Sequence, residues 1–125
     1  MNKPVTLLIA DRNPHVREFL KREMMAEGYR IQLVKSGQEL IEHIHNPDTL
    51  PDLVILDPDL PDANDLSLVN RIQQIVPELP VVIHTLQTEM VDQMKDVQSV
   101  IVIEKMGSSV DHLKIAVKNI LAMEG

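Results

Sequence analysis

The 125-residue sequence predicts an α/β protein in which five parallel strands and five helices alternate in one doubly wound sheet. Short apolar runs, rich in Val and Ile, alternate along the whole chain with segments whose apolar residues recur at helical spacing. The length suits one domain, and no internal repeat or long linker divides residues 1–125. We therefore predict a single domain with a (βα)5 fold.

The predicted strands are the apolar runs that lack helical spacing. None shows the strict alternation of a half-exposed strand, so each is expected to be covered on both faces. The runs span residues 5–10, 30–34, 53–56, 80–84 and 100–103.

Helix signals lie between and after these runs. An Asn13-Pro14 pair provides a cap and a first-turn proline for a helix that ends at Gly28. Ser36 and Glu39 form a capping box at the start of the second helix. The other three helices are predicted from residue 68 to just before Pro77, from after Thr88 to residue 97, and from Ser108 or Ser109 to residue 121.

Right-handed crossovers in such a sheet favour the strand order 2-1-3-4-5. Ligands of doubly wound sheets bind beyond the carboxyl ends of the strands, near the point where the order reverses. Four polar residues occupy strand ends there, and we predict that they form the functional site. They are Asp11, Asp57, Thr85 and Lys105.

Composition excludes several classes of protein. The chain has no Cys, so disulfides, thiolate metal sites and cysteine nucleophiles are absent. A net charge of -7 and an aromatic content of 2% argue against direct nucleic-acid binding. The first apolar run is too short for a signal peptide or a membrane span, so we expect a cytoplasmic protein without a membrane partner.

Four motifs give the chain an end-to-end resemblance to the receiver domains of bacterial two-component response regulators. They are LLIADRNP (7–14), DLVILDPDLP (52–61), PVVIHT (80–85) and EK (104–105). The resemblance implies a fold of the flavodoxin and receiver type. It also implies that Asp57 accepts a phosphoryl group from a histidine kinase or phosphotransfer protein, that Lys105 pairs with this group, and that Thr85 donates a switch hydroxyl.

The resemblance further implies a Mg²⁺ site formed by Asp11, Asp57 and the backbone carbonyl of Asp59. In the family a second acid usually follows the position of Asp11, whereas this chain has Arg12. Asp11, Asp57, Arg12 and Lys105 carry a formal charge near zero, where three acids and one lysine carry about -2. We therefore expect weak Mg²⁺ binding, unless the Arg12 guanidinium contacts the phosphoryl oxygens itself.

Two further departures concern signal output. Val102 occupies the position of the switch aromatic, and Met106 replaces the proline that usually follows the lysine. Both lie toward the usual output face, so relay to a downstream protein partner or to an output domain outside this sequence is expected to differ. Asp62 is expected to act as a loop or helix-start acid rather than as a ligand.

Two alternatives to a phosphoacceptor stay open at this point. One is a pseudo-receiver that binds a partner without phosphorylation, because Arg12 has replaced a metal ligand. The other is a haloacid-dehalogenase-like phosphatase, because Asp57-Pro58-Asp59 resembles the nucleophile and acid of that family. The phosphatase motif normally ends the first strand and needs a later acidic pair, and neither feature is found here.

Overall fold

The computed structural model of the chain describes residues 4–63, 67–86 and 100–124. Its strands form one parallel sheet in the order β2-β1-β3-β4-β5, which confirms the predicted order. The strands are β1 (Thr6–Ala10), β2 (Arg30–Val34), β3 (Leu53–Leu56), β4 (Val81–Thr85) and β5 (Val100–Glu104).

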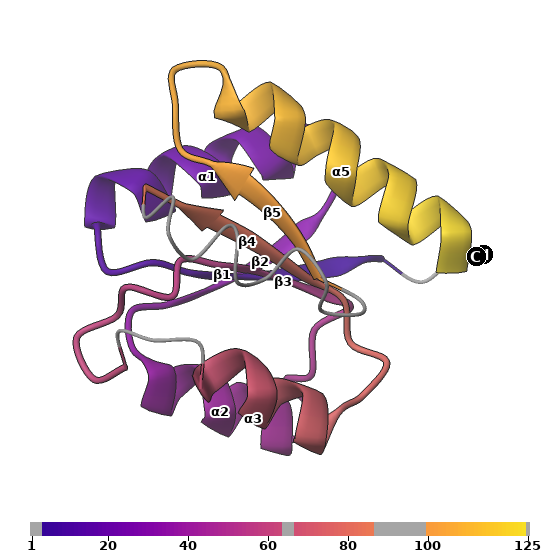
Figure 1. Cartoon of the computed structure of the whole chain (residues 1–125). Coiled ribbons are helices and arrows are strands. Elements are labelled where there is room, and N and C mark those ends of the chain that lie inside the picture. Colours follow the sequence, from indigo (N-terminus) through magenta and orange to yellow (C-terminus); the bar gives the residue numbers. More distant parts are fainter. Residues whose placement is uncertain (1–3, 64–66, 87–99, 125) are drawn as a thin grey trace.

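Helices cover both faces of the sheet, as Figure 1 shows: α1 and α5 lie on one face, and α2 and α3 lie on the other. They are α1 (Pro14–Ala26), α2 (Gly37–His45), α3 (Ser67–Ile75) and α5 (Ser109–Glu124). The helix predicted after Thr88 falls within residues 87–99, outside the described residues. None of the described helices has the length and apolar character needed to cross a bilayer.

Local signals at the helix starts act as predicted. The Asn13 side chain accepts hydrogen bonds from the backbone N–H groups of His15 and Val16, at 2.9 and 3.4 Å. Ser36 Oγ accepts from the N–H of Glu39 at 3.2 Å. Both side chains satisfy first-turn donors that have no partner within the helix. The chain directions into α1 and α2 are thereby fixed directly after β1 and β2.

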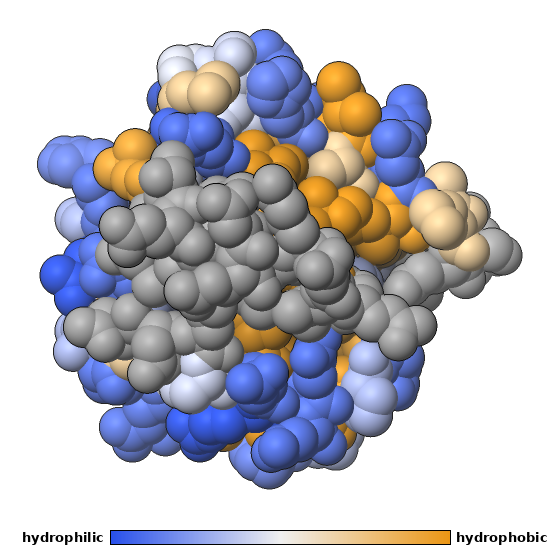
Figure 2. All heavy atoms as spheres, viewed as in Figure 1, coloured by the Kyte–Doolittle hydropathy of each residue, from blue (hydrophilic) through white to orange (hydrophobic). Residues whose placement is uncertain are grey.

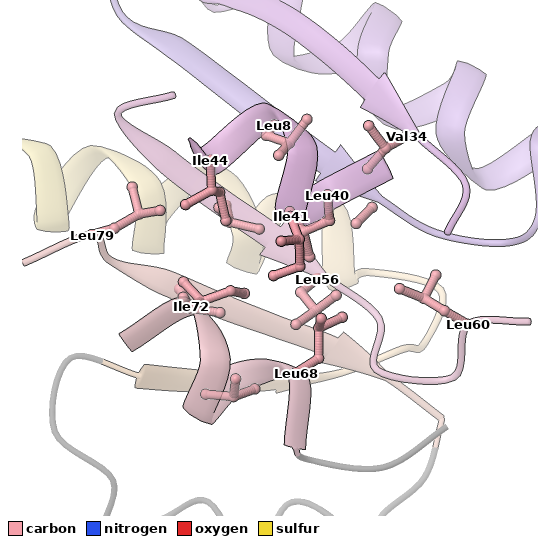
Figure 3. Close-up of a cluster of buried hydrophobic side chains, with 14 of the residues drawn as sticks. Leu8, Val34, Leu40, Ile41, Ile44, Leu56, Leu60, Leu68, Ile72 and Leu79 are labelled. Atoms are coloured by element: carbon pink, nitrogen blue, oxygen red, sulfur yellow. The ribbon is translucent and has the colours of Figure 1, made fainter. Parts of the chain in front are cut away.

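The core consists of two apolar clusters, one on each face of the sheet. Alternate residues of β1 divide between them, with Leu7 and Ile9 facing α1 and α5, and Leu8 and Ala10 belonging to the other cluster. Figure 3 shows the cluster between the sheet and the helices α2 and α3. Burying each large aliphatic side chain contributes roughly 1.5–3 kcal/mol, so a strand covered on both faces is held firmly.

Strand boundaries differ from the prediction by one residue in four places, one of which is the start of β4 at Val81 instead of residue 80. β1 begins at Thr6 instead of residue 5, and β4 and β5 extend to Thr85 and Glu104. The last two residues are paired across the sheet, so the ladder continues to the edge where the functional residues lie. The apolar runs of β4 and β5 end one residue before the strands do, because the last residue of each strand, at the carboxyl edge of the sheet, is polar.

Candidate functional site

Lys105 lies between two carboxylates at the carboxyl edge of the sheet. Its Nζ is 2.6 Å from Oδ2 of Asp57, which follows β3, and 2.8 Å from Oδ2 of Asp11, which follows β1. Lys105 itself follows β5, so it reaches past the end of β4 to both acids. The strand order therefore brings together three residues that are separated by up to 94 positions, from 11 to 105, in the chain.

Backbone hydrogen bonds orient both carboxylates. The remaining oxygen of Asp11 accepts from the N–H of Asn13 at 2.9 Å, and that of Asp57 accepts from the N–H of Asp59 at 3.0 Å. Each acid thus uses one oxygen for a turn with the residue two positions on, and the other oxygen for Lys105. Asp57 is also fixed through its own N–H, which donates to the carbonyl of Ala10 at 2.9 Å.

The three charged groups are largely removed from water. The relative exposure is 2% for Asp11 and 7% for Asp57, and 15% for the Lys105 side chain. Burial by itself lowers the pKa of Lys105, but the hydrogen bonds and negative charges of Asp11 and Asp57 outweigh it, so the pKa is raised. The lysine is therefore cationic at neutral pH.

Thr85 is fully buried at the end of β4, between the strands that precede Asp57 and Lys105. Its backbone carbonyl accepts a hydrogen bond from the N–H of Lys105 at 2.8 Å. This bond continues the ladder between β4 and β5 beyond the last paired residues. The positions of Thr85 and Lys105 are consequently coupled through the backbone.

Arg12 lies at the rim of this cluster. Its Nη2 is 3.9 Å from Oδ1 of Asp59, and the two side chains are 49% and 41% exposed. An ion pair this long and this exposed contributes little to stability. Its effect on the site is electrostatic, because it places a cation beside the loop after Asp57.

The donor set fits a hard cation of the Mg²⁺ type only in part. Asp11 and Asp57 carry carboxylate oxygens of the kind that Mg²⁺ prefers, and the predicted set would add the carbonyl of Asp59, with water or a phosphoryl group in the remaining positions. Within the described ranges, no three His, Cys, Asp or Glu side chains are arranged to hold a metal. Both carboxylates contact Lys105, and Arg12 adds positive charge, so the residues present suit weak binding.

Val102 and Met106, the two positions that were expected to affect output, lie outside this cluster. Val102 is half-buried and packs against the apolar cluster on the α2 and α3 face. Met106 is 54% exposed, and its chain segment contains no cis peptide bond, as is true of all described residues.

Some contacts near the site were not predicted from the sequence. Arg17 Nη1 donates to the Asp11 carbonyl at 2.7 Å. A buried histidine, His84, has its Nε2 2.9 Å from Oγ of Ser109, while its Nδ1 has no hydrogen-bond partner among the residues that the structure describes. Asp62 accepts hydrogen bonds from backbone N–H groups at the start of α2. Local spacing carries no signal for contacts between such distant segments.

Comparison with known proteins identifies the family. The model of the response regulator receiver domain matches residues 7–118. The response regulator MprA of Mycobacterium sp. (strain KMS) is 32% identical over 82 residues, which are 66% of this chain and 35% of the relative. The transcriptional regulatory protein TcrX of Mycobacterium tuberculosis is 29% identical over 92 residues, 74% of this chain and 38% of the relative. The chain thus spans about a third of the length of these relatives.

Solved structures agree with this result. A response regulator from Chloroflexus aurantiacus has a TM-score of 0.82 and 30% identity, covering 96% of this chain and 99% of that one. A receiver protein from Sinorhizobium medicae has a TM-score of 0.83 and 22% identity, with 96% of both chains covered, and supports the fold. Because the family model matches residues 7–118 of 125, this chain belongs to the response regulator receiver domains of two-component signalling.

Proposed function

We propose that residues 1–125 act as one phosphoacceptor module in which Asp57 receives a phosphoryl group. The contact between Lys105 and Asp57 supports this proposal most strongly, at 2.6 Å between Nζ and Oδ2. The ammonium group of Lys105 offsets the negative charge of Asp57. Asp57 itself lies at the carboxyl edge of the sheet, close to the surface although largely buried. Such an arrangement suits a carboxylate that is to approach a phosphoryl group, which is itself negative.

The proposed reaction is a simple displacement. An oxygen of Asp57 forms a bond to phosphorus while the bond between phosphorus and the donor nitrogen of a phosphohistidine breaks. The second ring nitrogen of the donor is protonated beforehand, so the donor leaves as neutral imidazole that keeps this proton. Lys105 then pairs with a phosphoryl oxygen. The raised pKa of Lys105 keeps the ammonium charged throughout this step. Thr85, buried at the neighbouring strand end, is the proposed hydrogen-bond donor to the phosphoryl group.

The proposed cation site consists of Asp11, Asp57 and the carbonyl of Asp59. When bound, Mg²⁺ supplies charge neutralisation to the phosphoryl oxygens. Arg12 lies beside Asp59 and reduces the negative charge available to the ion. We accordingly propose that this chain needs a higher Mg²⁺ concentration than a receiver with an acid at residue 12.

The proposed partners are a cytoplasmic histidine kinase or phosphotransfer protein and a downstream protein. Exposed apolar side chains near the site suit such contacts. Phe19, Leu86 and Met106 are 41%, 72% and 54% exposed, and they line a cavity of about 340 Å³ that Lys105 also lines. Figure 2 shows that apolar residues (orange) also reach the surface in the region that β5 and α5 occupy in Figure 1.

One observation favours a second candidate function. The Arg12 guanidinium lies at 3.9 Å from Asp59, in the place where the family usually has an acid for the metal. If Arg12 excludes Mg²⁺ altogether, the chain would act as a pseudo-receiver that binds its partner without phosphorylation. Because the chain belongs to the receiver family, we do not propose the haloacid-dehalogenase-like phosphatase as a function.

The test is phosphorylation by small-molecule donors. Purified protein is incubated with Mg²⁺ and either acetyl phosphate or phosphoramidate, and the mass gain of one phosphoryl group is followed by mass spectrometry. We expect the gain in the natural chain and none in Asp57→Asn. Phosphorylation of both proteins would place the acceptor elsewhere.

An absence of phosphorylation would favour the pseudo-receiver. Beryllofluoride, which mimics the phosphoryl group, provides the second measurement through two-dimensional amide spectra. Changes around Asp11, Asp57, Thr85 and Lys105 that vanish in Asp57→Asn support the phosphoacceptor. No response at high Mg²⁺ would contradict it.

A further inference from the structure

Asp62 joins the loop after β3 to the start of α2, which lies 25 residues earlier in the chain. Its Oδ1 accepts from the N–H of Gly37 at 2.7 Å, and its Oδ2 accepts from the N–H of Gln38 at 3.0 Å. Asp62 follows Asp57 by five residues, on the same loop that carries Asp59. Both oxygens of one carboxylate are therefore committed to the backbone of another element.

This contact completes the cap of α2. Ser36 already accepts from the N–H of Glu39, so Asp62 satisfies the two first-turn donors that Ser36 does not reach. A negative charge at a helix N-terminus is favourable. The two backbone hydrogen bonds lower the pKa of Asp62, with a smaller contribution from the charge of Arg71. The carboxylate is ionised at neutral pH, so the contact persists under the conditions of signalling.

The loop between Asp57 and Asp62 is held at a further point. Leu60 is 1% exposed and belongs to the apolar cluster beneath α2 and α3. Figure 3 shows its side chain directed from the loop toward that cluster. The backbones of Leu60 and Ala63 exchange two hydrogen bonds, at 3.0 and 3.2 Å. Asp59 therefore lies on a short segment that is fastened on both sides.

Gly37 permits this close approach. A Cβ built at Gly37 would lie 3.3 Å from Oδ1 of Asp62 and 3.4 Å from the Cβ of Ala63. The first distance is tighter than an ordinary van der Waals contact. A methyl group at this position would force the Asp62 carboxylate to shift by a few tenths of an ångström. The contact between Asp62 and Gly37 can therefore be altered by a substitution at either residue. Gly37 lies 20 positions before Asp57 in the chain.

From these contacts we propose that Asp62 is a positioning residue of the phosphoacceptor site, clamping the loop onto α2 and so holding the backbone of Asp59 for the cation. The proposal rests on the function proposed above. Asp62 touches neither the phosphoryl group nor the cation; it acts through Asp59. The sequence prediction of a loop or helix-start acid did not specify the start of α2 as its partner.

The experiment compares three variants of the full chain. Asp62→Ala removes the acceptor oxygens, and Gly37→Ala presses on the same contact from α2. Asp52→Ala is the matched control, because Asp52 also accepts a backbone hydrogen bond, from the N–H of Thr6 at 2.8 Å, at the opposite edge of the sheet. Beryllofluoride affinity at a fixed Mg²⁺ concentration is measured by amide titration, and folding is verified in the same spectra.

We expect Asp62→Ala and Gly37→Ala to weaken this affinity about tenfold, the effect typical of lost support behind a metal ligand. Asp52→Ala should stay within about twofold of the natural chain. Equal affinity in the natural chain and in a folded Asp62→Ala would overturn the proposal, because the contact of Asp62 with Gly37 and Gln38 would then be structural only. Should Asp62→Ala not fold, Gly37→Ala and the milder Asp62→Asn decide the question.

A second readout separates this proposal from the proposed function. The amide resonance of Asp59 is compared in the natural chain and in Gly37→Ala, without Mg²⁺ or beryllofluoride. A shift of this resonance supports the clamp even if the natural chain binds no beryllofluoride, in which case the proposed function alone has failed. An unchanged resonance in Gly37→Ala would overturn the clamp.

Discussion

The ammonium group of Lys105 lies 2.6 Å from the Asp57 carboxylate, and this contact crosses the end of β4 between the two strands that carry them. A second carboxylate, Asp11, shares the same ammonium at 2.8 Å. Two buried acids therefore depend on one cation. Asp57 needs a counter-ion because it is buried, and it is also the proposed phosphoacceptor. Lys105 therefore serves both the stability of the fold and the proposed function.

Replacing Lys105 by Met should destabilise the fold at neutral pH. Asp11 and Asp57 would remain buried without a counter-ion, and breaking a buried ion pair in this way costs about 3–5 kcal/mol. Urea unfolding at pH 7 measures the loss. The adjacent Met106→Leu, at an exposed side chain outside the cluster, is the control and should unfold like the natural chain.

The loss in Lys105→Met should shrink when Asp57 is changed to Asn in the same chain, because one of the two uncompensated charges is then removed. A double variant that is as unstable as the single variant would contradict this account. It would mean that Lys105 stabilises the protein through packing of its aliphatic part, not through its charge.

Changing Arg12 to Asp should strengthen Mg²⁺ binding. The substitution removes a positive charge beside Asp59 and adds a negative one, and a change of two charges near a divalent ion is worth on the order of tenfold in affinity. Amide titration with Mg²⁺ measures it. Arg22→Asp makes the same charge change on an exposed part of α1 and should leave the affinity nearly unchanged. Equal effects of the two variants would indicate a general charge effect and would contradict a specific role for Arg12.

Patterns within short segments predicted most of the fold. Asn13 and Ser36 cap the helices that they were expected to cap, since a cap depends on residues two or three positions away. The strand order followed from the handedness of crossovers. Because that order fixes which strand ends are neighbours, the grouping of Asp11, Asp57 and Lys105 was also predictable.

Contacts between segments that are distant in sequence were not predictable. Asp62 was correctly expected to be a polar loop residue, but its partners Gly37 and Gln38 belong to an earlier helix. No partner was predicted for His84, and its Nε2 lies 2.9 Å from Oγ of Ser109 on α5. Such pairings depend on how far each loop and helix extends over the sheet, which no short pattern encodes.

Gly28 and Gly107 should respond in opposite ways to substitution by Ala. Gly28 has φ +97°, a conformation that costs other residues about 1–2 kcal/mol, while an added Cβ would meet nothing within 4 Å. Gly28→Ala should therefore lose about that amount in free energy of unfolding through backbone strain alone. Gly107 also has open space but no positive φ, so Gly107→Ala should be neutral or slightly stabilising. Urea unfolding of both variants is the measurement, and an equal loss in both would show that strain at Gly28 is relieved.

His84 should make the stability of the protein fall as the pH is lowered from 7 to 5. Burial lowers its pKa from 6.5 to about 4, and the charge of Lys105 acts in the same direction, while Asp11 and Asp57 act against it. Because the folded state resists protonation, the unfolded chain binds the extra proton first. The contribution is fully present above pH 6.5 and is lost as the pH falls toward 4. From these two values the loss is about 2 kcal/mol at pH 5.

The measurement compares urea unfolding of the natural chain and His84→Gln at pH 7 and pH 5. Glutamine keeps a polar group that can bond to Ser109 Oγ but does not titrate, so it removes only the proton linkage. The difference in unfolding free energy between the two proteins should therefore change by about 2 kcal/mol, in favour of His84→Gln at pH 5. Acids that titrate in the same range contribute to both proteins and cancel in this comparison. Parallel pH profiles would mean that water reaches the His84 ring and that its pKa stays near the ordinary value.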